Sequence, residues 1–220
     1  MNNKDKIEIL DGNINSFDKI FKILVIGESG VGKSSLTLRV AKNIFSENYV
    51  PTIGFETLSL FLKINEKIIK LEIWDTCGQE MYRPLIKSYY KGASMVILVY
   101  SIDNLNSFNK LNEWINNIRE FSKENIKIFL IGNKIDISEN QRKISKDMGN
   151  KFYKDNKINK FFEVSAKTSH NINDIFIEAA KLLYEDSNNK GEENKIIYHD
   201  DFIVIEEKNQ FSQTCNDNCC

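Results

Sequence analysis

The sequence has few cysteines, no long apolar run and almost no net charge. Its four cysteines lie at positions 77, 215, 219 and 220, a layout that argues against a disulfide framework and fits a reducing compartment. The longest apolar stretch, residues 95–100, is far shorter than the roughly 20 residues that a membrane-spanning helix needs. A net charge of −1 over 220 residues argues against a large, sequence-independent nucleic-acid surface. We therefore expect no membrane span and no nucleic-acid partner.

Length and charge distribution predict one domain with a polar segment at each end. A chain of 220 residues with 41% apolar content has room for one ordinary core. Residues 186–220 contain eight acids and three bases, a net charge of −5, which leaves +4 on residues 1–185. We expect a flexible N-terminal extension over 1–19, a single domain over 20–185 and a flexible tail over 186–220. The polar end segments bury too little apolar surface to offset the entropy lost on ordering.

Short apolar segments alternate with helical patterns, which is typical of an α/β domain. Helical spacing is clearest from Phe108 to Ile118 and from Ile172 to Leu183. Only residues 65–67 separate two of the strand segments, a gap too short for a crossover helix and suitable for an antiparallel hairpin. We predict a six-stranded, mostly parallel sheet with one antiparallel strand and helices on both faces. The strand segments are 23–26, 58–64, 68–74, 95–100, 126–131 and 161–164.

A glycine-rich segment after the first of these strands is typical of a phosphate-binding loop. Residues 27–34 read Gly-Glu-Ser-Gly-Val-Gly-Lys-Ser and open a helical stretch. Gly27, Gly30 and Gly32 allow backbone N–H groups to turn inward around phosphates, and the helix N-terminus adds a favourable dipole. Lys33 would supply positive charge and Ser34 a magnesium ligand. The alternative is a strand-to-helix turn without a ligand.

A second loop predicts selectivity for guanine. Asn133-Lys134-Ile135-Asp136 follows a predicted strand, at the edge where open α/β sheets bind ligands. The Asp136 carboxylate can accept from both N1–H and the 2-amino group of guanine, a donor pair that adenine lacks. We expect Asn133 to tie this loop to the phosphate site and the Lys134 stem to cover the base. Without a phosphate loop elsewhere, the same tetrapeptide would be interpreted as a polar turn.

The segment after the predicted hairpin carries candidate metal and catalytic residues. Asp75 ends a strand, where its carboxylate can hold magnesium through the water shell of the metal. The Gly78 amide could bond the γ-phosphate only while that group is present, which makes the segment sensitive to the nucleotide. Gln79 is the candidate for orienting the attacking water.

Taken together, these motifs resemble the Ras-like GTPases, and further details resemble their Rab branch. The phosphate loop and the motifs at 51–54, 74–80, 133–136 and 165–167 occur in the order of that family, over about residues 20–185. The Rab-like features are Tyr-Tyr-Lys-Gly-Ala at 89–93, Leu-Val-Tyr at 98–100, Ser107-Phe108 with Leu111 and Trp114, and the terminal Cys219-Cys220.

The resemblance assigns roles to residues that their spacing alone does not single out. Thr52 would bind magnesium and the γ-phosphate, and Phe45 would pack on the guanine ring. The backbone amide of Ala166 would face the guanine O6 atom, and Lys167 would support the base from below. The resulting catalytic set is Gln79, Lys33 and Thr52, and the magnesium set is Ser34, Thr52 and Asp75. The nucleotide-contacting set is Glu28, Ser29, Gly30, Val31, Gly32, Lys33, Ser34, Ser35, Phe45, Thr52, Gly78, Asn133, Lys134, Asp136, Ser165, Ala166 and Lys167.

Several positions depart from the usual Rab pattern. Residues 53–57 read Ile-Gly-Phe-Glu-Thr where Ile-Gly-Val-Asp-Phe is usual, and Met81-Tyr82 stands in place of Arg-Phe. Cys77 replaces an alanine and Ser101 replaces an aspartate. Most of these positions lie in or near the segments that contact partners, so they affect partner choice more than nucleotide chemistry.

The resemblance implies a P-loop GTPase that cycles between GDP and GTP, uses Mg²⁺ and regulates vesicle and membrane traffic. No arginine in the motifs is an obvious finger in cis, so we expect slow hydrolysis, about 10⁻⁴ to 10⁻² s⁻¹, accelerated by an activating protein. The main alternative is a nucleotide-gated binding module with negligible hydrolysis. Two further candidates are a P-loop kinase or ATPase and an adaptor with a vestigial pocket.

The same resemblance implies partners and a membrane anchor. We expect a monomer that meets an exchange factor, a GTPase-activating protein, a GDP-dissociation inhibitor or escort protein, and effectors. Cys219 and Cys220 would carry prenyl groups, which places the protein on the cytoplasmic face of intracellular membranes and, in part, in the cytosol. Because an acidic tail is repelled by anionic lipids, two lipid chains are needed for a firm anchor.

Overall fold

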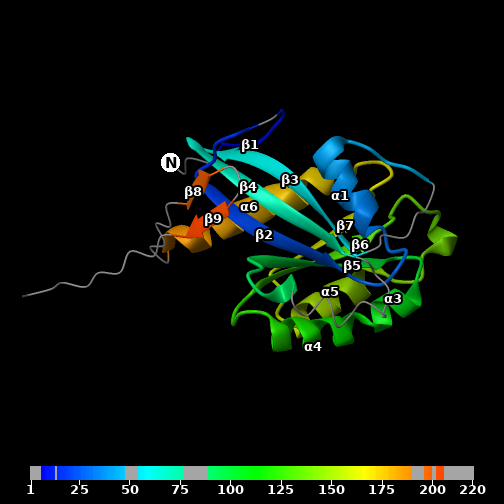
Figure 1. Ribbon diagram of the computed structural model, residues 1–220. Helices are drawn as coiled ribbons and strands as arrows, with labels where there is room; N and C mark the ends of the chain where they lie inside the picture. Colours follow the sequence, from blue (N-terminus) through cyan, green and yellow to red (C-terminus); the bar gives the residue numbers. More distant parts are fainter. Residues whose placement is uncertain are drawn as a thin grey trace, which may run out of the picture.

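Seven strands form one mixed sheet in the order β1-β3-β4-β2-β5-β6-β7 (Figure 1). The computed structural model describes residues 6–12, 14–47, 54–76, 89–189, 196–199 and 202–205. Strands β4, β2, β5, β6 and β7 are paired in parallel, and β3 is antiparallel to β4. The predicted α/β class and hairpin are therefore confirmed. The strands are β1 (Ile7–Leu10), β2 (Lys19–Ile26), β3 (Phe55–Ile64), β4 (Lys67–Thr76), β5 (Met95–Ser101), β6 (Lys127–Asn133) and β7 (Lys160–Val164).

The seventh strand, β1, corrects the expected count of six. It pairs antiparallel with β3, from Ile7 opposite Ile64 to Leu10 opposite Phe61, within a segment that we expected to be flexible. Ile7 and Ile9 alternate along β1 and pack against the core, because side chains two residues apart on a strand share a face. The outer edge of β3 supplies backbone groups for the pairing.

The other end of the chain also contains secondary structure beyond the expected domain boundary. Helix α6 (Ile172–Asn189) continues past residue 185, and β8 (Ile196–His199) pairs antiparallel with β9 (Phe202–Ile205). The domain boundaries themselves stay a prediction.

Helices cover both faces of the sheet. They are α1 (Lys33–Lys42), α3 (Leu105–Asn109), α4 (Leu111–Phe121), α5 (Lys146–Asp155), α6 and the short 3₁₀ helix η2 (Glu139–Gln141). The helical pattern from Phe108 to Ile118 is divided between α3 and α4, which meet at Lys110. Across the described part of the chain, no helix combines the length and apolar character needed to cross a bilayer.

Two apolar cores lie on opposite faces of the sheet because strand side chains alternate. In β2, Ile23 and Val25 enter the core shared with α1 and α6, whereas Leu24 and Ile26 enter the core shared with α4. Figure 1 shows α1 on one side of the sheet and α3, α4 and α5 on the other. Because five strands run in parallel, their carboxyl ends meet at one edge, where open sheets of this kind bind ligands.

Candidate functional site

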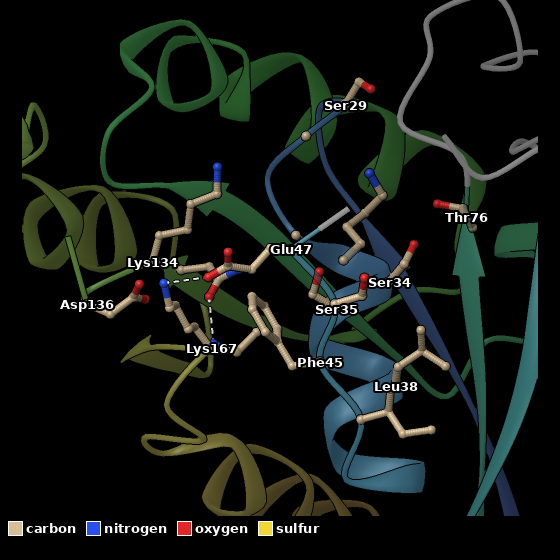
Figure 2. Close-up of a pocket in the computed structure, with 17 residues that line it drawn as sticks. Ser29, Ser34, Ser35, Leu38, Phe45, Glu47, Thr76, Lys134, Asp136 and Lys167 are labelled. Atoms are coloured by element: carbon tan, nitrogen blue, oxygen red, sulfur yellow. Dashed lines mark hydrogen bonds and ion pairs between the residues drawn. The ribbon is translucent and has the colours of Figure 1, made fainter. Parts of the chain in front are cut away.

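A cavity of about 490 Å³ opens at the carboxyl edge of the sheet (Figure 2). Its walls come from the loop after β2, the start of α1, the segment after α1, and the loops after β6 and β7. The structure thus brings together motifs that are far apart in the sequence. The predicted residues that line the cavity are Ser29, Gly30, Gly32, Lys33, Ser34, Ser35, Phe45, Asn133, Lys134, Asp136, Ala166 and Lys167.

The loop after β2 holds a lysine ammonium group at the start of α1. Lys33 is only 6% exposed, and its Nζ atom donates hydrogen bonds of 2.9 Å to the carbonyl oxygens of Gly27 and Glu28. Gly32 caps α1 with a left-handed φ of 93°, a conformation that glycine adopts without steric cost. A fixed positive charge beside a helix N-terminus is a favourable place for an anion.

Asn133 joins three loops of the site. Its Nδ2 group donates to the Val31 carbonyl oxygen at 2.9 Å, and its Oδ1 atom accepts from the Ala166 amide at 3.2 Å. The side chain is 1% exposed, so both bonds form in a shielded environment. Asn133 thus links its own loop to Val31 of the predicted phosphate loop and also to Ala166 of the loop after β7.

Asp136 is held by a residue of the neighbouring loop. The Ser165 hydroxyl donates to Asp136 Oδ1 at 2.5 Å, and the same oxygen of Ser165 accepts from the Thr168 amide at 3.0 Å. Ser165 itself is buried and does not line the cavity. Its contribution is to orient the Asp136 carboxylate.

Arg39 was not predicted, yet it fixes the wall formed by the loop after β7. Its Nε atom donates to the Ala166 carbonyl oxygen at 2.9 Å, and its Nη2 atom donates to the Lys167 carbonyl oxygen at 3.1 Å. The guanidinium carbon lies 5.6 Å from the centre of the Phe45 ring. Arg39 lies 127 residues before Ala166 and 128 before Lys167 in the sequence, so no local sequence pattern indicates these contacts.

Glu47 is a second residue that the sequence did not indicate. Its carboxylate pairs with Lys167 Nζ at 2.8 Å, and both residues line the cavity (Figure 2). The hydrogen bond and charge of Glu47 raise the pKa of Lys167. Both side chains are exposed, so we expect this pair to contribute little to folding stability.

Asp75 is a buried carboxylate at the end of β4. It is 1% exposed, and neither oxygen has a well-directed hydrogen bond among the described residues. Burial raises the pKa of Asp75 to about 6, while the nearby Ser34 hydroxyl and Lys33 ammonium act to lower it. A buried carboxylate next to a hydroxyl is a suitable oxygen-donor set for a hard divalent cation such as Mg²⁺.

Some predicted residues lie elsewhere. The Glu28 side chain accepts a hydrogen bond of 3.0 Å from Trp114 Nε1, and Val31 is fully buried in the core. Because neither residue lines the cavity, only their backbone groups remain candidates for contact with a ligand. Thr52, Gly78, Gln79, Cys219 and Cys220 lie outside the described residues.

Comparison with known proteins agrees with this geometry. The model of the Ras family matches residues 22–185. Ras-related protein Rab-8 of Diplobatis ommata is 39% identical over 82% of this chain and 85% of its own length. Ras-related protein Rab-1 of Theileria parva is 44% identical over 76% of each chain, and human Ras-related protein Rab-8B is 39% identical over 80% of this chain and 84% of its own. The chain belongs to the Ras family of small GTPases, within its Rab branch.

Proposed function

We propose that this protein is a molecular switch that alternates between GDP- and GTP-bound forms and regulates vesicle and membrane traffic through its effectors. The observation that carries the proposal is the pair of hydrogen bonds made by the Asn133 side chain. They join Val31 of the phosphate loop to Ala166 of the loop after β7. A purine nucleotide needs a phosphate cradle and a base reader at a fixed separation, and Asn133 sets that separation.

Base recognition rests on the loops after β6 and β7. Asp136, oriented by Ser165, accepts from the two donors of guanine. Phe45 and the Lys134 stem flank the ring, Lys167 supports it, and the Ala166 amide faces O6. The same Ala166 amide already donates to Asn133, so guanine O6 would share this donor or replace Asn133 as its acceptor.

Phosphate binding rests on the loop after β2. The Lys33 ammonium would exchange its carbonyl partners for β- and γ-phosphate oxygens, and backbone amides from Ser29 to Ser35 would complete the cradle. Ser34, Thr52 and Asp75 would hold Mg²⁺, either directly or through its water shell. When bound there, Mg²⁺ neutralises charge on the phosphate oxygens.

We assign slow GTP hydrolysis to this site, stimulated by a GTPase-activating protein. Gln79 would orient the attacking water, Thr52 and Lys33 would stabilise charge on the γ-phosphoryl group, and the Gly78 amide would respond to the presence of that group. The buried Asp75 beside Ser34 supports a metal-assisted reaction rather than nucleotide binding alone.

Nucleotide competition combined with single-turnover hydrolysis tests this function. A fluorescent GDP analogue should be displaced by GTP and GDP and not by ATP, in a magnesium-dependent manner. Gln79→Leu should retain GTP binding and lose hydrolysis, with and without an activating protein. Displacement by ATP would contradict the guanine assignment, and equal hydrolysis by Gln79→Leu and the wild type would contradict the water-orienting role of Gln79. A wild type that binds GTP without measurable turnover would favour a binding module with negligible hydrolysis.

Family membership also supports the proposed partners and location. The partners are an exchange factor, an activating protein, a GDP-dissociation inhibitor or escort protein, and effectors. We assign prenyl groups to Cys219 and Cys220, which would place the protein on the cytoplasmic face of intracellular membranes and allow exchange with the cytosol.

A further inference from the structure

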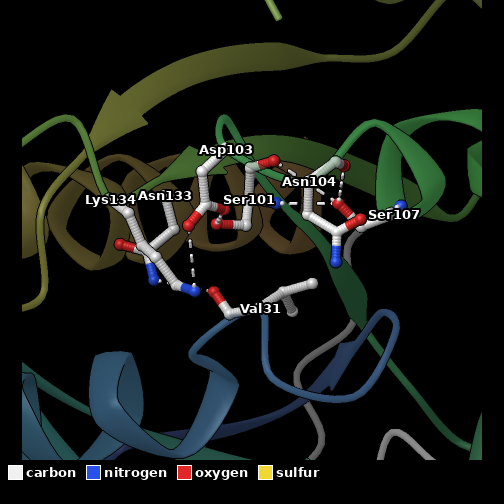
Figure 3. Close-up of polar contacts among 7 residues, drawn as sticks. All are labelled: Val31, Ser101, Asp103, Asn104, Ser107, Asn133 and Lys134. Atoms are coloured by element: carbon white, nitrogen blue, oxygen red, sulfur yellow. Dashed lines mark hydrogen bonds and ion pairs between the residues drawn. The ribbon is translucent and has the colours of Figure 1, made fainter. Parts of the chain in front are cut away.

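The ends of β5 and β6 place an acid beside the lysine of the base-binding loop. The two strands are parallel neighbours, with Ser101 opposite Asn133, and the Ile102 amide donates to the Asn133 carbonyl oxygen at 3.1 Å. The residues that follow therefore leave the sheet side by side. Figure 3 shows the result, in which Asp103 Oδ2 lies 3.6 Å from Lys134 Nζ.

The backbone on either side of Asp103 is held firmly. The Ile102 carbonyl oxygen accepts from the amides of Lys143 at 2.8 Å and Ile144 at 3.0 Å. On the other side, Asn104 Oδ1 caps α3 by accepting from the Ser107 amide at 3.2 Å. Asp103 thus has a defined position rather than that of a mobile loop residue.

Two buried serines connect Asp103 to this frame. The Ser101 hydroxyl donates to Asp103 Oδ1, and the Ser107 hydroxyl accepts from the Ser101 amide at 3.1 Å. In this chain Ser101 stands where the Rab pattern has an aspartate, and Asp103 follows two residues later. The carboxylate that faces Lys134 therefore belongs to Asp103.

Lys134 gains orientation from this acid. Its backbone is fixed in the left-handed region with φ of 74°, but its side chain has four rotatable bonds and a large rotamer entropy. A partner for the ammonium group restricts the stem to orientations along the wall of the cavity, which Lys134 lines.

We propose that Asp103 is a positioning residue which, by holding Lys134 over the base, sets how long a guanine nucleotide stays bound. This inference rests on the proposed function. Both side chains are about one-third exposed, so Asp103→Asn should speed nucleotide release only about two- to fivefold. GDP and GTP should be affected equally because Lys134 faces the base, and hydrolysis of bound GTP should keep its single-turnover rate.

The release rate of a fluorescent GDP analogue from the full chain tests the proposal. Lys134→Met keeps the apolar stem and removes the ammonium group, so adding Asp103→Asn to this variant should cause no further change. Glu178→Gln is the matched control, because it breaks an ion pair of similar exposure with Lys160, at the start of β7 and away from the cavity. The control should release the nucleotide at the wild-type rate.

The outcomes separate the two proposals. If the wild-type protein binds the analogue and Asp103→Asn releases it at the same rate, the inference is overturned. It is also overturned if Asp103→Asn has its full effect in the Lys134→Met background, since the acid would then act through general loop structure. A wild-type protein that does not bind guanine nucleotides overturns the proposed function instead, and this inference with it.

Discussion

The Trp114 indole Nε1 donates a hydrogen bond of 3.0 Å to Oε1 of Glu28 in the phosphate loop. Trp114 lies on α4 and is 2% exposed, whereas Glu28 directly follows Gly27 at the end of β2. The bond links the core beneath α4 to a loop that we expect to surround phosphates. The position of α4 is thereby coupled to the shape of the nucleotide site.

Replacing Trp114 with phenylalanine should weaken nucleotide retention. Phenylalanine keeps an aromatic ring in the core but leaves the Glu28 carboxylate without this donor. A hydrogen bond to a charged group contributes about 1.5–3 kcal/mol. If its loss weakens nucleotide binding by about 1.4 kcal/mol, GDP release speeds up about tenfold. Release of a fluorescent GDP analogue measures the effect.

Trp74→Phe is the matched control for that variant. Trp74 Nε1 also donates to a glutamate, Glu72 Oε2, at 2.9 Å, but neither residue of this pair belongs to the phosphate loop. We expect wild-type GDP release from Trp74→Phe. Lower stability of Trp114→Phe with unchanged release would show that the bond to Glu28 supports the fold alone.

Gly32→Ala should disrupt both stability and nucleotide binding. A Cβ atom at Gly32 would lie 2.3 Å from Asn133 Nδ2, and its φ of 93° is strained for any residue with a side chain. Strain of this kind costs about 1–3 kcal/mol, and displacing Asn133 would also break its bonds to Val31 and Ala166. Urea unfolding and nucleotide titration measure the two effects.

Gly30→Ala introduces the same kind of backbone strain as Gly32→Ala, but without a steric clash with Asn133. Gly30 also has a left-handed φ, 76°, but a Cβ atom at this position would meet nothing within 4 Å. We expect a smaller loss of stability, about 1 kcal/mol, than for Gly32→Ala. Equal losses from the two variants would contradict the view that Asn133 is the sensitive contact.

Asp136→Asn should change base preference from guanine to xanthine. The asparagine Oδ1 atom can still accept from the Ser165 hydroxyl, which holds Asp136 Oδ1 at 2.5 Å, so the amide group would stay in place. Its N–H₂ group would then donate to the base edge, where xanthine offers an acceptor and guanine a donor. We expect a shift of at least about tenfold in the ratio of XDP to GDP affinity.

The control for this change is Asp136→Ala, which removes both the acceptor and the donor. It should weaken GDP binding without improving XDP binding. Guanine preference that stays unchanged in Asp136→Asn would exclude Asp136 as the base reader.

Cys219 and Cys220 should each carry an isoprenoid group when the protein is made in eukaryotic cells. Mass spectrometry of the intact chain should show two additions, one of which is lost in each single Cys→Ser variant. The double variant should become cytosolic and still hydrolyse GTP, because the cysteines are remote in sequence from every nucleotide-site motif. An unmodified terminus with intact membrane association would contradict the anchor.

The chemistry-bearing motifs were predictable because each is local. Residues 27–34 and 133–136 bring their functional groups into place through a single strand-to-loop turn, so the spacing of the first motif indicates a phosphate site, and the second gains its meaning from the presence of the first. Apolar periodicity likewise predicted the six strands of the main domain and the β3–β4 hairpin. Strand β1 was missed, because four residues between polar segments are too short a signal without the edge of β3 beside them.

The amino-acid sequence by itself therefore determined the fold class, the family and the candidate residues for phosphate, metal and base. Tertiary structure alone decided how these residues are held. The bonds from Trp114 to Glu28, from Arg39 to Ala166 and from Asp103 to Lys134 join residues that no spacing rule relates. Such contacts depend on which helices and loops the order of the strands brings to one edge of the sheet. The packing of both cores together sets that order, and no single segment does so alone.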